Sequence, residues 1–276
     1  MIYNANRITV RVLASSSSGN ATLVTCGDRA IMVDCGLTLN YMDKYISKFG
    51  SFFPQIDALI ITHAHIDHAG GTAIKRFAEK DIAIYCHKQA KPRLNEEWHI
   101  IKSAKSKGLL KLFDKEPFET PGFVIKHFDV QHDADSHCCG FCILPKGVSA
   151  TKKITIATDL GVFSEHVLAH FVDSDIMILE SNYDHEMLIA SDRPAYLKTR
   201  IQNTHLSNKK CAQAIDQILE KTNKIPKYIF LAHISDQCNT PELAYNETNK
   251  VIKKHKPKKI SLVLSHKNKV SEVVIL

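Results

Sequence analysis

The segment THAHIDHAGG, from Thr62 to Gly71, constrains this chain more than any other because it gathers four metal-ligating side chains in one short stretch. The side chains are His63, His65, Asp67 and His68. Imidazole and carboxylate groups bind Zn²⁺, Mn²⁺ and Fe²⁺. The apolar run Ala58 to Ile61 just before them predicts a short buried strand. Alternation along its extended end would direct His63 and His65 from one face.

The small residues Ala69, Gly70 and Gly71 allow the backbone to turn into a helix, which would bring Asp67 and His68 to a second point. Two ligands at each of two adjacent points predict two metal ions. The alternative is a histidine-rich surface turn, since the chain has 15 histidines. An apolar strand leading directly into the motif argues against that alternative.

Three later segments repeat the same local pattern, in which a short apolar strand is followed by a metal-capable side chain. They are VIKHFDVQHDA, KITIATDLG and YIFLAHISD, and their candidate ligands are His132, Asp159 and His233. Taken singly, His132 could be a hydrogen-bonded loop residue, Asp159 a helix N-cap and His233 a core residue. Two metals sharing four residues would be under-coordinated, and these three side chains complete them.

Helical patterns alternate with these strands. One follows Ser207, with apolar positions at Cys211, Ile215, Ile218 and Leu219. Another follows Thr240, where Pro241 and Glu242 are typical of a first helical turn. Mixed strands and helices with ligands at strand ends predict an α/β layered fold with its site along one sheet edge.

Composition is that of a globular protein. A chain of 276 residues that is 44% hydrophobic can bury one large core, so we expect one domain over residues 1–276. The N-terminus lacks an apolar signal-peptide core, and no run is long enough to span a bilayer. The eight cysteines follow no zinc-ribbon or secreted-knot spacing, which favours reduced thiols in a cytoplasmic protein. The cluster CCGFC could hold a soft metal, but ordinary strand residues are the preferred interpretation.

The formal net charge is +7, and much of it lies in the segments Lys250 to Lys259 and His266 to Lys269. Such a patch would attract a nucleic acid. A solvated, lysine-rich helix end is an equally good interpretation.

The order of these motifs, H-x-H-x-D-H followed by a His, an Asp and a His, resembles the metallo-β-lactamase superfamily. The pieces LASSSSGNATLV, IMVDCG, LESNYDHEML, RPAYLKTRIQNTHLSN and LAHISDQCNTPE are more specifically similar to its bacterial YycJ/WalJ-type (VicX) group, linked to DNA exonuclease activity. They also resemble ribonuclease Z. Thr204 stands where that group commonly has Gly before the histidine of HLSN.

The resemblance implies a four-layer αβ/βα sandwich with a dinuclear site at the sheet edges. It implies that the first metal is held by His63, His65 and His132 and the second by Asp67, His68 and His233, with Asp159 bridging them. Two divalent ions, Zn²⁺ or Mn²⁺ with Fe²⁺ possible, are the implied cofactors. No cysteine occupies position 159, unlike the secreted antibiotic-hydrolysing branch.

Two such metals would generate hydroxide at neutral pH by lowering the pKa of a shared water towards about 7. A leaving alkoxide then needs a proton donor, for which His205 is the candidate because it lies two residues before the expected N-cap Ser207. A buried capping histidine is the alternative for His205. We take Asp67 and His205 as the catalytic candidates.

Supporting residues are expected around the ligands. Asp34 and Glu180 each end an apolar strand and could orient ligand histidines, although either could be a turn former. The SSSSGN loop, with Ser17 and Asn20, could offer hydroxyls and amides to a phosphate, or could be a plain hairpin connection.

The leading functional hypothesis is a dinuclear phosphodiesterase that acts on nucleic acid, as a DNA 5′-exonuclease, through a metal-bridging hydroxide. The alternative is a hydrolase of a carboxyl derivative, a thioester or lactone, with the same metal centre. A third possibility is a metal-stabilised binding or scaffold protein without turnover.

Overall fold

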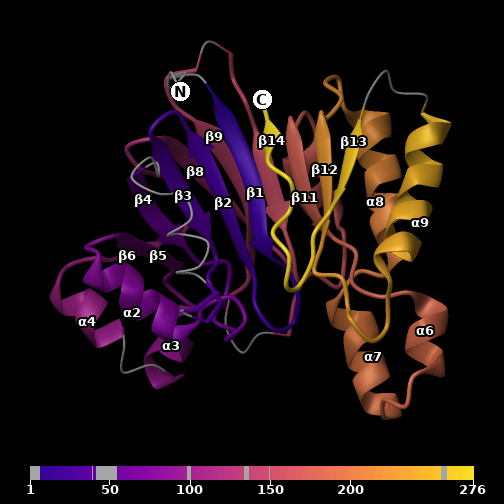
Figure 1. Cartoon of the computed structure of the whole chain (residues 1–276), viewed down its shortest axis with the longest axis horizontal. Helices are drawn as coiled ribbons and strands as arrows, with labels where there is room; N and C mark the ends of the chain where they lie inside the picture. The colour runs from indigo at the N-terminus through magenta and orange to yellow at the C-terminus, as the bar shows by residue number, and fades with distance from the viewer. Residues whose placement is uncertain are drawn as a thin grey trace.

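Two β-sheets lie face to face, and helices cover the outer face of each (Figure 1). The computed structural model describes residues 7–38, 40–41, 55–97, 101–133, 137–148, 150–255 and 260–276. Within these residues each sheet has seven strands. This is the αβ/βα sandwich that the resemblance to the metallo-β-lactamase superfamily implies.

The first sheet has the strand order β14-β1-β2-β3-β4-β5-β6. Its strands are β1 (Ile8–Ala14), β2 (Ala21–Cys26), β3 (Arg29–Val33), β4 (Gln55–Ile60), β5 (Ala83–His87), β6 (Leu110–Phe113) and β14 (Val274–Ile275). Strands β3 to β6 are parallel to one another.

The second sheet has the order β13-β12-β11-β10-β9-β8-β7. Its strands are β7 (Phe118–Glu119), β8 (Phe123–Asp129), β9 (Cys139–Pro145), β10 (Ile154–Ala157), β11 (Ile176–Glu180), β12 (Tyr228–Ala232) and β13 (Ser261–Leu264). Strands β10 to β13 are parallel, and β8 runs in their direction because it is antiparallel to β9, which is antiparallel to β10.

The helices divide between the two outer faces and one end of the molecule. The first sheet carries α2 (Gly71–Glu79), α3 (Lys91–Glu97) and α4 (Ile101–Ser106). The second carries α5 (Glu165–Phe171), α8 (Asn208–Lys221) and α9 (Pro241–Lys254). Two further helices among the described residues, α6 (His185–Ala190) and α7 (Ala195–Thr204), extend beyond the ends of the second sheet (Figure 1).

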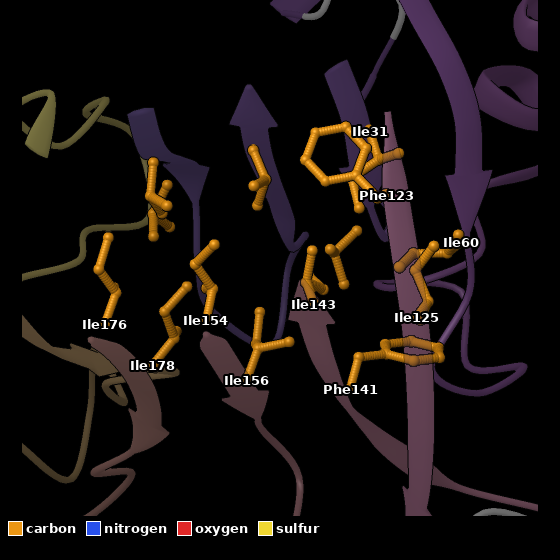
Figure 2. Close-up of a cluster of buried hydrophobic side chains, with 14 of the residues drawn as sticks. Ile31, Ile60, Phe123, Ile125, Phe141, Ile143, Ile154, Ile156, Ile176 and Ile178 are labelled. Atoms are coloured by element: carbon orange, nitrogen blue, oxygen red, sulfur yellow. The ribbon is translucent and has the colours of Figure 1, made fainter. Parts of the chain in front are cut away.

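Strand alternation builds three apolar layers. In the central layer, Ile31 and Ile60 of the first sheet lie beside Phe123 and Ile125 of the second (Figure 2). Ile176 and Ile178 of the second sheet lie further along the same layer. Met177, which lies between those two isoleucines in sequence, points to the outer layer beneath the helices instead. Burying each of these side chains contributes roughly 1.5–3 kcal/mol relative to exposure, so the register of each strand is strongly specified.

Several local predictions are confirmed. The strand predicted over 58–61 is β4, although it ends at Ile60, so His63 and His65 follow it in a bend instead of extending it. Helix α2 begins at Gly71 as expected. The Ser207 and Thr240 side chains accept hydrogen bonds from Lys210 N and Leu243 N and so cap α8 and α9.

The cysteines are free and buried. Cys139 packs in the central layer, whereas Cys138 and Cys142 pack in the layer beneath the helices. Neighbouring cysteines of CCGFC therefore point to opposite faces, which confirms that they are ordinary strand and strand-end residues. No helix among the described residues is long and apolar enough to cross a membrane.

Three histidines outside the predicted ligand motifs form a cluster between the sheets, in which His87 is buried and His127 and His137 are half-buried. His87 ends β5, His127 lies on β8, and His137 stacks on His87 with ring centroids 3.6 Å apart. Burial, and then the charges of His137 and His127, lower the pKa of His87 to about 4. Burial also lowers the pKa of His127 and His137, against the opposing charges of Asp129 and Asp114.

We expect this cluster to make the protein acid-sensitive. Because folding lowers these pKa values, the unfolded chain binds protons that the folded protein rejects, so stability falls as the pH drops from about 6.5 towards 4. The loss between pH 7 and pH 5 should be at least about 1 kcal/mol, allowing for solvent screening at the cluster edge. The free energy of unfolding, measured with urea at several pH values in this range, should depend less steeply on pH in His137→Gln than in the wild-type protein. The exposed-histidine variant His185→Gln should keep the wild-type slope, and an equal slope in all three proteins would contradict the prediction.

Candidate metal centre

The sheet topology brings the predicted ligands to one edge. His63, Asp159 and His233 follow the carboxyl ends of β4, β10 and β12, and these ends of parallel strands open on the same side of their sheets. His132 follows β8, which runs in the same direction as β10. The seven predicted side chains come together there in overlapping groups whose ligand atoms lie within 4.8 Å of one another.

The first group is His63, His65 and His132. His63 Nε2 lies 3.1 Å from His65 Nδ1. The His132 ring centroid is 5.3 Å from that of His63 and 5.1 Å from that of His65. Burial first, and then repulsion from neighbouring imidazoles, lowers the pKa of both His63 and His65. These rings are therefore neutral at pH 7, the form that binds a metal.

The second group is Asp67, His68 and His233. His68 Nε2 lies 3.5 Å from Asp67 Oδ2, and His233 Nε2 lies 3.9 Å from the same oxygen. Burial opposes protonation of His233, but Asp159, Asp67 and Glu180 raise its pKa to about 10. The carboxylates likewise outweigh burial and raise the pKa of His68. This half of the site thus attracts positive charge.

Asp159 lies between the two groups. Its Oδ2 is 2.9 Å from His68 Nε2, while its Oδ1 is 3.9 Å from His132 Nε2 and 3.4 Å from His233 Nδ1. It does not cap a helix, because α5 begins later, at Glu165, with Ser164 as its N-cap. One carboxylate therefore reaches donors of both groups.

The hydrogen-bond partners of the Nδ1 atoms turn the Nε2 atoms of these rings towards the centre of the site. His68 Nδ1 donates to Asp34 Oδ2 at 2.8 Å, His233 Nδ1 to Glu180 Oε1 at 2.8 Å, and His132 Nδ1 to the Thr204 carbonyl at 3.0 Å. Because each Nδ1 already has an acceptor, Nε2 is the atom left to bind a metal ion, which would take the place of any proton there. His233 Nε2 is buried without a hydrogen-bond partner, and Asp159 Oδ2 is buried against His68 Nε2. Such converging acceptors fit divalent metal ions.

Glu180 is fully buried and holds His205 at the edge of the site. Its Oε1 accepts from His205 Nδ1 at 2.7 Å as well as from His233, and its Oε2 accepts from the backbone N–H groups of Leu160 and Leu206, both at 3.1 Å. Although Glu180 belongs to a group with metal-binding spacing, four donors already occupy its oxygens. Glu180 thus orients histidines and has no lone pair left for a metal.

His205 is the residue after α7 and lies 3.7 Å from Asp159 Oδ1 through its Nδ1. Burial opposes a charge on its ring, but Glu180 and Asp159 raise its pKa. Gly161 lies against the same corner, where a Cβ would be 1.7 Å from the Asn203 carbonyl oxygen. Only glycine permits this close approach of the Asp159 loop to the end of α7.

The SSSSGN segment connects β1 to β2, as the hairpin interpretation predicts. Asn20 reaches the site, with its Nδ2 2.9 Å from His68 Nε2 and 3.4 Å from Asp67 Oδ2. Ser17, in contrast, is exposed in the turn. Ser207 acts as the N-cap of α8.

Sequence reasoning missed two supporting residues. The Thr62 hydroxyl donates to Asp34 Oδ2 at 2.8 Å and lies 3.0 Å from His63 Nδ1. The Ser15 hydroxyl accepts from His233 N at 2.8 Å. Thr62 lies immediately before the first ligand, and this position was the signal that could have indicated its role. Nothing in the sequence near Ser15 indicates its contact with His233.

The backbone is strained at three site residues that the sequence did not mark as special. Asp34, Asp159 and His233 have φ values of 58°, 59° and 55°, in the left-handed region that side chains other than glycine rarely adopt. Each follows a parallel strand closely, and the unusual turn directs its side chain into the site. Such strain concentrates at functional sites.

The described part of the basic C-terminal region is largely paired. Lys250 pairs with Glu247, Lys254 with Asp216, and Lys267 with Asp236. Residues 256–259 lie outside the described residues, so the structure leaves both interpretations of that segment open.

Comparison with known proteins agrees with this geometry. A family model described as the beta-lactamase superfamily domain matches residues 29–234. Exodeoxyribonuclease WalJ of Streptococcus pneumoniae is 28% identical over 246 residues, which cover 85% of this chain and 84% of that protein. Exodeoxyribonuclease YycJ of Bacillus anthracis is 27% identical and covers 87% of this chain and 88% of its own length.

Solved structures share the fold. The metallo-beta-lactamase fold protein YhfI from Bacillus subtilis has a TM-score of 0.65 at 16% identity, covering 98% of this chain and 100% of that one. The short form of human tRNase Z has a TM-score of 0.60 at 16% identity, and the match covers 95% of this chain and 98% of that one. At these identities the likeness concerns the fold alone.

Proposed function

Since this chain belongs to the beta-lactamase superfamily, whose domain model it matches over residues 29–234, we propose that it is a dinuclear phosphodiesterase that hydrolyses DNA as a 5′-exonuclease. That it is a metal-dependent hydrolase follows from the family itself. The relatives named exodeoxyribonuclease support DNA as the substrate.

We assign His63, His65 and His132 to one metal position and Asp67, His68 and His233 to the other, with Asp159 shared. The convergence of imidazole nitrogens and carboxylate oxygens supports this assignment. Two divalent ions, Zn²⁺ or Mn²⁺ with Fe²⁺ also suited to the donors, would lower the pKa of a water and neutralise charge on the phosphoryl oxygens. Asn20, Asp34 and Thr62 hold the imidazoles of these positions in place.

The observation that carries the phosphodiester assignment is the Glu180–His205 pair. Breaking a phosphodiester releases an alkoxide, which requires a proton. His205 holds a proton on Nδ1 against a buried carboxylate, its pKa is raised, and its side chain is 18% exposed beside Asp159. We assign it as the proton donor to the leaving oxygen.

The test is digestion by protein reconstituted with Zn²⁺ or Mn²⁺. DNA and RNA labelled at the 5′ or 3′ end, single- and double-stranded, are compared with a thioester and a lactone. We expect release of short 5′-terminal products from DNA, and none from chelator-treated protein. Turnover of only the thioester or lactone would refute the phosphodiesterase assignment and favour a carboxyl-derivative hydrolase.

A further inference from the structure

A cavity of about 220 Å³ lies against the loop 15–20, and this loop contacts the second ligand group. The residues that line it include Ser16, Ser18, Leu37, Tyr41, Lys267 and Asn268. The described lining residues thus offer hydroxyls, an amide and an ammonium, together with one aromatic ring and one aliphatic side chain, and none of them carries a carboxylate. This chemistry suits an anionic ligand that also has an apolar part.

The wall between cavity and site is the loop 15–20. Its inner side contacts the second ligand group, because Asn20 N donates to the Asp67 carbonyl at 2.7 Å and Ser15 Oγ accepts from His233 N. Its outer side, with Ser16, Ser18 and Gly19, lines the cavity. The same six-residue loop therefore contacts the second ligand group and lines the cavity.

Lys267 supplies the positive charge. Its Nζ lies 2.7 Å from Asp236 Oδ2, and the two side chains are 37% and 50% exposed. Exposed ion pairs contribute little to stability, so the ammonium can exchange this carboxylate for a phosphate. The Tyr41 hydroxyl donates to the Leu13 carbonyl at 3.0 Å, which holds its ring at the cavity wall.

We propose that this cavity binds the nucleotide next to the scissile phosphodiester, with Lys267 contacting that nucleotide's own phosphate. The proposal rests on the proposed phosphodiesterase function and adds a subsite to it. A substrate with a second phosphate, one nucleotide away from the cleaved bond, would then be preferred over one without it.

The test uses two pairs of chromogenic esters that release p-nitrophenolate. One pair is thymidine 5′-(p-nitrophenyl phosphate) with and without a 3′-phosphate. The other is thymidine 3′-(p-nitrophenyl phosphate) with and without a 5′-phosphate. We expect the second phosphate to raise kcat/KM about tenfold in one pair, which identifies the side of the scissile bond that the cavity serves.

Three variants test the role of Lys267. Lys267→Gln should reduce the gain in kcat/KM that the second phosphate gives to below about twofold, because the charge-assisted hydrogen bond is lost. Asp236→Asn should increase the gain, because it removes the carboxylate that competes for Lys267. Lys250→Gln, which breaks a comparable exposed pair with Glu247 on α9, should keep the wild-type gain.

A gain that persists in Lys267→Gln, or no gain in either pair for wild-type protein that cleaves the esters, would overturn the subsite while leaving the phosphodiesterase assignment standing. Failure of the wild-type protein to cleave any phosphodiester would overturn both.

Discussion

Asp159→Asn is expected to lower phosphodiester hydrolysis by at least about a thousandfold and to reduce the bound metal. The carboxylate lies between the two ligand groups, 2.9 Å from His68 Nε2 and 3.9 Å from His132 Nε2. Asparagine preserves the shape but loses the negative charge, and its NH₂ group cannot ligate a cation. Metal content by mass spectrometry and turnover of bis(p-nitrophenyl) phosphate measure the two effects.

Asp81→Asn is the matched control. Asp81 shares the left-handed backbone, with φ 56° against 59° for Asp159, but it is exposed and pairs with Lys107. It should keep wild-type metal content and turnover. Circular dichroism should show both variants folded, because the Asp159 change removes a buried charge without altering volume. An Asp159→Asn protein with full metal content and activity would exclude Asp159 as the shared ligand.

Glu180→Gln is expected to lower kcat by about 10- to 100-fold. The Glu180 carboxylate accepts four hydrogen bonds, from His205, His233 and two backbone N–H groups. A glutamine amide has only one acceptor oxygen, so two of these donors lose their partner. Breaking this buried network should also lower the free energy of unfolding by roughly 2–4 kcal/mol.

The leaving group separates the proton-donor role of His205 from simple loss of stability. If Glu180 acts by keeping His205 protonated and oriented, Glu180→Gln should slow DNA, whose leaving group is an alkoxide, more than it slows a p-nitrophenyl ester. Glu165→Gln, which breaks an exposed pair with Lys221, should change neither rate. An equal loss on both substrates would assign Glu180 a structural role only.

The local structure around the site is largely predictable from sequence. The strand before His63, the helix from Gly71 and the capped helices after Ser207 and Thr240 follow from periodicity and capping, which act over a few residues. The opposite orientations of Cys138 and Cys139 follow from strand alternation in the same way.

The contacts that complete the site could not be predicted from the sequence. Ser15 and His233 are 218 residues apart and meet only because β1 and β12 end at the same edge. The left-handed backbone conformation occurs at Asp34 and Asp159 themselves, and an aspartate does not indicate a positive φ as a glycine would. Such features depend on which strands pair and in what register, and neither is encoded in a short segment.

The sequence by itself determined the chemistry of the donors and the elements that present them, because imidazole and carboxylate side chains and their spacing are local properties. Tertiary structure alone decided that Asp159 lies between two ligand groups and that Glu180 accepts hydrogen bonds from two histidines at once. It also decided that the loop 15–20 contacts the second ligand group and lines the cavity that contains Lys267. The physical reason is that these distances are set by the packing of two sheets and by the register of their strands. Burial of the apolar layers between the sheets and beneath the helices specifies both.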